Sequence, residues 1–81
     1  MEVKVLFFAS IRDITGMQNI GLQLADDTTV SGLRKELIRK YPKLKCTDTK
    51  CAVAVNQEYV ADDQILSNGD EVALIPPVSG G

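Results

Sequence analysis

The sequence contains no histidine. Histidine is the usual general base near neutral pH and the commonest metal ligand in proteins. Its absence excludes a Ser/His or Cys/His catalytic pair, and no glycine-rich loop resembles a phosphate-binding cradle. We therefore expect neither a metal site nor an enzyme that works through its own side chains.

Cysteine is also scarce. Cys46 and Cys51 occur in the stretch CTDTKC. A zinc site needs about four nitrogen or sulfur ligands, and a redox pair normally has the tighter C-x-x-C spacing. Two reduced thiols, either structural or on the surface, fit a cytoplasmic protein better.

Long apolar runs are missing as well. No segment approaches the length of a membrane span, and the start of the chain lacks the basic region and the cleavage site of a signal peptide. The sequence thus predicts no membrane association and a cytoplasmic location.

The net charge is only −2, but the charges are unevenly distributed. Beyond Lys50 every charged residue is acidic. These acidic residues are either simply solvated or steer the chain toward a positively charged partner. Nucleic-acid binding is not expected, because the chain is acidic overall. Most of the basic residues come earlier: Arg34, Lys35, Arg39, Lys40, Lys43, Lys45 and Lys50.

The hydrophobic content of 44% suits one domain with a compact core. Alternating apolar residues predict strands at 2–8, around 20–24, at 52–56 and at 71–75. The first two strands are close enough along the chain to pair in the antiparallel sense.

Two helical segments are predicted. The stretch SIRDITG has Ser10 as a candidate N-cap, Asp13 as an acid in the first turn and Gly16 as a left-handed stop. The main helix lies in TVSGLRKELIRKYP, where Thr29 is a candidate N-cap and Pro42 ends the helix. The order β-β-α-β-β, with one short helical insertion, predicts an α+β domain in which one main helix covers a small mixed sheet.

The chain ends in Gly80 and Gly81, just after a proline pair. Proline favours an extended exit from the sheet, and glycine can thread a narrow channel because it has no side chain. Small residues at a terminus can also be incidental. We expect residues 1–75 to form the domain and residues 76–81 to form an extended tail that delivers the Gly81 carboxylate to another protein's active site.

Some apolar residues of the first and last strands share a face with charged ones. Leu6 and Phe8 lie on the face of Lys4, and Ile75 lies on the face of Glu71. If the charged residues point to solvent, these three apolar residues cannot join the core. They are either partly covered by loops or part of an exposed protein–protein interface near the tail.

Three stretches carry a resemblance to a known family: VKVLFFASIRDITG, AVAVNQEYV and GDEVALIPPVSGG. Together they are similar to the small subunits of molybdopterin synthase, which are ubiquitin-like sulfur carriers. The likeness covers nearly the whole chain, with the exception of the stretch from Pro42 to Lys50. A terminal Gly-Gly is shared with ubiquitin and with the thiamine sulfur carrier, but IPPVS together with FFAxxRDxxG points to the molybdopterin branch.

The resemblance implies a β-grasp fold, in which the first and last strands are parallel neighbours. It also implies a heterotetramer in which the carrier contacts the large subunit of the synthase through Phe8, Tyr59 and Ile75. The resemblance further implies that the C-terminal tail is inserted into the large subunit. This tail consists of Pro76, Pro77, Val78, Ser79, Gly80 and Gly81.

The chemistry that the resemblance implies takes place at Gly81. A ubiquitin-activating-like adenylyltransferase uses ATP to adenylate its carboxylate, and a persulfide from a sulfurtransferase replaces AMP to leave a thiocarboxylate. The sulfur then attacks cyclic pyranopterin monophosphate, and two such transfers build the dithiolene of molybdopterin. The carrier itself is a non-catalytic subunit that binds no cofactor, and ATP serves the activating enzyme.

Other roles stay open. A protein modifier would join Gly81 to lysines, and a different sulfur carrier would serve thiamine synthesis or tRNA thiolation. Both use the same activated terminus, so the Gly-Gly ending does not separate them from the synthase role. A plain binding module with an incidental terminus is a further alternative.

Overall fold

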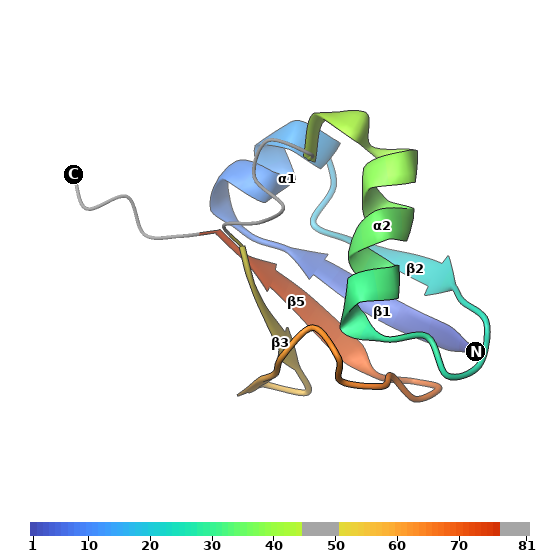
Figure 1. The fold of residues 1–81 in the computed structure, drawn as a ribbon. Helices are drawn as coiled ribbons and strands as arrows, with labels where there is room; N and C mark the ends of the chain where they lie inside the picture. The colour runs from blue at the N-terminus through green and yellow to red at the C-terminus, as the bar shows by residue number, and fades with distance from the viewer. Residues whose placement is uncertain (45–50, 77–81) are drawn as a thin grey trace.

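The structure, a computed structural model, describes residues 1–44 and 51–76. These residues form five strands, two α-helices and one turn of 3-10 helix, η1 (Figure 1). In chain order the elements are β1 (Glu2–Phe7), α1 (Ala9–Thr15), β2 (Asn19–Gln23), α2 (Val30–Lys40), η1 (Pro42–Leu44), β3 (Ala52–Val55), β4 (Glu58–Tyr59) and β5 (Glu71–Ile75).

The strands form one mixed sheet in the order β2-β1-β5-β3-β4. β1 pairs with β2 in the antiparallel sense and with β5 in the parallel sense, and β3 is antiparallel to both β5 and β4. The expected mixed sheet is confirmed, and so is the parallel pairing of the first and last strands. This pairing brings the ends of β1 and β5 to the same edge of the molecule.

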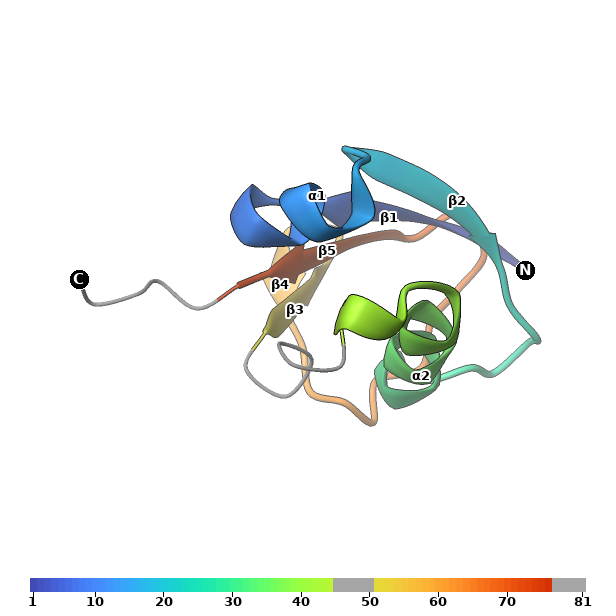
Figure 2. The same cartoon turned by 90° about the horizontal axis from the view of Figure 1, so that it is seen from above.

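Both helices cover one face of the sheet, as the two views in Figures 1 and 2 show. Apolar side chains alternate along each central strand, so that one set faces the helices. Leu33 and Leu37 of α2 pack onto that set with at most 1% of their surface exposed. The core includes Val3, Val5, Phe7, Ile11, Val30, Leu33, Leu37, Val53, Val72 and Leu74.

The start of α1 differs from the expectation. Phe8 is the N-cap residue, its side chain makes no capping hydrogen bond, and the first turn contains no acidic residue. Ser10 therefore lies inside the helix, and both Ser10 as N-cap and Asp13 as a first-turn acid were wrong. The cause is the sharp turn at Ala9, where φ is 47°, because the chain passes from β1 into α1 without a loop.

The other helix ends follow the sequence signals. Gly16 adopts φ 74° and its N–H donates to the Arg12 carbonyl at 2.8 Å, which is a left-handed stop. The Thr29 hydroxyl accepts a hydrogen bond from the Gly32 N–H at 3.2 Å, as an N-cap should. α2 stops at Lys40, two residues before Pro42.

The sequence did not predict β4. It has only two residues and follows a tight turn in which Asn56 and Gln57 adopt φ 51° and 73°. Two left-handed residues in succession make a type I′ turn, whose twist matches that of an antiparallel hairpin. The turn places Tyr59 opposite Ala54 of β3.

Cys51 is part of the buried core, and its carbonyl accepts a hydrogen bond from the Arg34 guanidinium at 2.8 Å. Cys46 lies outside the described residues. Within residues 1–44 and 51–76, no helix is long and apolar enough to cross a membrane.

Candidate functional site

The sheet face that the helices do not cover, called here the outer face, carries a row of apolar residues. Leu6 is in register with Ala73, Ala73 with Ala54, and Ala54 with Tyr59. Residues in register across neighbouring strands point to the same side of a sheet, so the row crosses four strands. One apolar band therefore runs over the outer face.

A second row lies next to the first, on the side where β5 ends. Ile75 is in register with Ala52, and Phe8 directly follows the last residue of β1. Residues of both rows, together with Gln57 and Glu71, line a shallow depression of about 290 Å³. We call its lining the docking surface: Leu6, Phe8, Ala54, Gln57, Tyr59, Glu71, Ala73 and Ile75.

Large apolar side chains are exposed on the docking surface. Phe8 exposes 45% of its surface and Tyr59 exposes 73%, whereas the core residues on the opposite face expose almost none. Exposed aromatic residues grouped around one depression are typical of protein–protein interfaces. The outer face therefore has the character of a surface that another protein covers.

The outer face changes from polar to apolar along the strands. At the start of β1 and β5 it presents Glu2, Lys4 and Glu71, and Lys4 is in register with Glu71. At the end of the same strands it presents Phe8 and Ile75. Since Pro76 directly follows Ile75, the apolar end of the face is the end from which the chain continues toward Gly81.

The structure brings together three of the residues that the sequence assigned to an interface. Phe8 lies between β1 and α1, Tyr59 lies in β4 and Ile75 lies in β5, and all three line the same depression. Their contact with a partner remains a prediction. Of the assigned tail, Pro76 is described and is half-buried at the end of β5, whereas Pro77, Val78, Ser79, Gly80 and Gly81 lie outside the described residues.

Two residues of the docking surface, Ala54 and Gln57, were missed in the sequence. Ala54 follows the core residue Val53, so strand parity could have placed it on the outer face. Gln57 gave no such signal, because its position depends on the left-handed turn before β4.

The docking surface holds no catalytic set of side chains. Its one carboxylate comes from Glu71, and its other polar groups are the Gln57 amide and the Tyr59 hydroxyl. No group of three His, Cys, Asp or Glu residues that could hold a metal ion occurs in the part of the chain that the structure describes. Most of its lining residues are apolar or aromatic.

Ala9, which directly follows Phe8 of the docking surface, has a strained backbone. Its left-handed φ of 47° costs an L-residue about 1–2 kcal/mol. We expect Ala9→Val to lower the free energy of unfolding in urea by a further 1–2 kcal/mol or so, because a β-branched residue tolerates this region worst. Ala9→Gly should stay within about 1 kcal/mol of the parent, since relief of strain is offset by a more flexible unfolded chain. Equal stability of the valine and glycine variants would contradict this account of the turn.

Comparison with known proteins identifies one family. The model of the ThiS family matches residues 5–81. The molybdopterin synthase sulfur carrier subunit of Escherichia coli K12 is 42% identical over 81 residues, with 98% of this chain and 99% of that protein covered.

Two solved structures extend the comparison. A complex of subunits 1 and 2 of the molybdopterin-converting factor from Helicobacter pylori contains a chain that is 28% identical, with a TM-score of 0.73 and full coverage of both chains. The small archaeal modifier protein 1 of Haloferax volcanii is 26% identical, with a TM-score of 0.86, and the match covers 95% of this chain and 98% of that one. The fold is thus the ubiquitin-like β-grasp.

Proposed function

Because this chain belongs to the ThiS family, we propose that it acts as the sulfur carrier subunit of molybdopterin synthase in molybdenum cofactor biosynthesis. The observation that carries this function is similarity over the whole chain to proteins of that name, at 42% identity in Escherichia coli. The geometry supports it, because an apolar docking surface lies beside the strand end that leads to the Gly-Gly sequence.

The working group in this proposal is the Gly81 carboxylate. A carboxylate is a poor electrophile, so an adenylyltransferase first joins it to AMP at the expense of ATP and releases pyrophosphate. The terminal sulfur of a persulfide then bonds to the carbonyl carbon as AMP leaves. A thiol cleaves the S–S bond, which forms a disulfide and releases the thiocarboxylate. Its sulfur bonds to a carbon of cyclic pyranopterin monophosphate in place of an oxygen, and water then cleaves the acyl C–S bond and regenerates the Gly81 carboxylate. Two such transfers complete the dithiolene.

The partner in the last step is the large subunit of the synthase. The Helicobacter pylori structure, in which subunits 1 and 2 of the converting factor form a complex, supports such a partner. In our proposal the large subunit covers Phe8, Tyr59 and Ile75, and it receives the tail that begins at Pro76. Two carriers and two large subunits form a heterotetramer in the cytoplasm, and the sulfurtransferase and the adenylyltransferase act before it assembles.

The division of labour follows from the residues that the chain contains. The sequence has no histidine, and the docking surface offers one carboxylate, one amide and one phenol. The acids, bases and phosphate contacts of each step therefore come from the partner enzymes. The carrier contributes a surface for docking and a reactive terminus, and it binds no cofactor of its own.

Intact-mass measurement tests the proposal. After incubation with the adenylyltransferase, ATP and a persulfide donor, the chain should gain the mass difference between one sulfur and one oxygen. The gain should disappear when ATP is left out, because no acyl adenylate forms. An unchanged mass in the complete mixture would refute the sulfur carrier.

A protein modifier is the second candidate, because the similarity to the archaeal modifier protein covers 95% of this chain. In that case the activated terminus would form isopeptide bonds, and the same measurement on a cell extract would show a ladder of larger conjugates. We rank it second because the curated relative at 42% identity bears the synthase name.

A further inference from the structure

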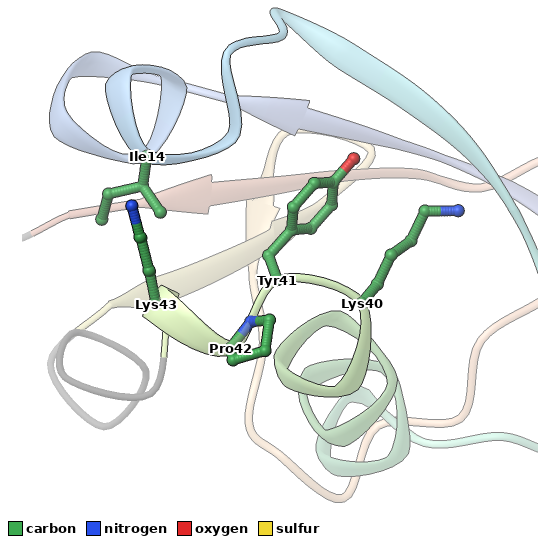
Figure 3. Close-up of a pocket in the computed structure, with 5 residues that line it drawn as sticks. All are labelled: Ile14, Lys40, Tyr41, Pro42 and Lys43. Atoms are coloured by element: carbon green, nitrogen blue, oxygen red, sulfur yellow. The ribbon is translucent and has the colours of Figure 1, made fainter.

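A second surface lies on the helical side of the molecule, opposite the docking surface. The end of α1 and the turn between α2 and η1 enclose a hollow of about 210 Å³, shown in Figure 3. We call it the basic pocket and define it by its lining: Ile14, Lys40, Tyr41, Pro42 and Lys43.

The floor of the basic pocket is apolar. Ile14 and Tyr41 are half-buried against the core, and the Tyr41 ring meets Phe7 edge-on with the ring centroids 6.0 Å apart. The Tyr41 hydroxyl lies 3.8 Å from the Met17 sulfur, and Met17 still exposes 47% of its surface. Apolar surface thus remains open to solvent around a firmly packed aromatic ring.

The rim of the pocket is cationic. Lys40 and Lys43 are exposed, and in Figure 3 their side chains extend on either side of the Tyr41 ring. Neither ammonium group forms an ion pair within residues 1–44 and 51–76, although the charge of Lys40 adds to the hydrogen bond from Arg39 in lowering the pKa of the Glu36 carboxyl group. The nearby Arg39 differs, because it donates hydrogen bonds to Glu36 and thereby lowers the pKa of that carboxyl group. Two cations beside open apolar surface are therefore available to a ligand.

We propose that the basic pocket binds an acidic segment of a partner protein that also carries an apolar side chain. The apolar side chain would occupy the floor at Ile14 and Pro42, and flanking carboxylates would pair with Lys40 and Lys43. A polybasic membrane patch needs about four to eight cations, and this pocket has two. Its half-apolar lining equally disfavours nucleic acid, which is held mainly through phosphate contacts. A protein segment can supply both the carboxylates for the two lysines and the apolar side chain for the floor.

The position of the basic pocket allows a second protein to bind while the docking surface is occupied. The sheet lies between the helices that form the pocket and the outer face, so a protein at the basic pocket does not compete with one at the docking surface (Figures 1 and 2). The carrier can therefore hold two proteins at once. A second protein would be kept beside the carrier while its terminus is charged or discharged.

Amide chemical shifts of the full-length ¹⁵N-labelled chain give a direct test. The probe is the acetylated peptide EELFDE amide, and its uncharged counterpart is QQLFNQ amide. The acidic peptide should shift the amides of Ile14, Tyr41 and Lys43, and it should do so equally when the outer face is occupied by the large subunit. Shifts centred on Phe8 and Tyr59, equal binding of the uncharged peptide, or no binding at all would each overturn the proposal.

Matched variants separate the pocket from general charge attraction. Lys40→Gln with Lys43→Gln should weaken binding of the acidic peptide about 3- to 10-fold, as two exposed ion pairs allow. Lys4→Gln with Lys35→Gln removes the same charge from exposed positions outside the pocket and should leave the affinity unchanged. Equal weakening by both double variants would mean non-specific attraction and would refute the site.

Discussion

Deletion of Gly81 should reduce molybdopterin formation in a reconstituted synthase assay by at least about 100-fold. Without this residue the terminal carboxylate moves back by one residue, roughly 3.5 Å. A misplacement of about 1 Å can already lower a rate 100-fold when the reacting atoms must meet in a fixed geometry. The shortened tail would thus hold its carboxylate away from both the adenylating and the sulfur-accepting site.

The free energy of unfolding should not change in the same variant. The last core residue is Leu74, and β5 ends at Ile75, so the deleted residue lies beyond the described core. Urea unfolding and the affinity for the large subunit serve as the controls. Gly81→Ala keeps the carboxylate at its full reach and adds one methyl group, so it should lose less activity than the deletion. Undiminished molybdopterin formation by the deletion variant would exclude the terminal carboxylate as the sulfur-bearing group.

The outer face was largely predictable from the sequence. Side chains alternate between the two faces of a strand, so the residues that share a face with the charged Lys4 and Glu71 can be assigned to the outer face. The parallel pairing of β1 with β5, which came from the family resemblance, then places Phe8 and Ile75 at one edge. The strand faces are encoded by local patterns, and for that reason they were predicted correctly, whereas the strand pairing was predicted from the resemblance alone.

Features that depend on tertiary contacts were not predictable in this way. Serine is one of the preferred N-cap residues. The direct turn at Ala9 nevertheless starts the helix earlier and places Ser10 inside it. β4 is too short to show a period, although it carries Tyr59. The cluster of basic residues from Arg34 onward was apparent in the sequence. The hollow between Ile14 and the basic residues was not, because it forms only where α1 and η1 pack together.

Phe8→Asp should weaken binding of the large subunit about 30- to 1,000-fold. Truncation of a central aromatic residue at an interface costs about 2–4 kcal/mol, and a buried carboxylate without a partner adds to that loss. Phe8 exposes 45% of its surface in the isolated chain, so the substitution should leave folding nearly intact. Calorimetric titration of the large subunit, with urea unfolding of each variant alongside, measures both quantities.

Ile65→Asp is the matched control for this prediction. Ile65 exposes 54% of its surface, close to the value for Phe8, but it is not part of the docking surface. Its backbone instead forms an isolated β-bridge with Thr29, the N-cap residue of α2. The same charge at this position should change the affinity less than about 3-fold, the usual range for a residue outside an interface. If Phe8→Asp binds as tightly as the parent, or if Ile65→Asp is equally harmful, the docking surface is not where the large subunit binds.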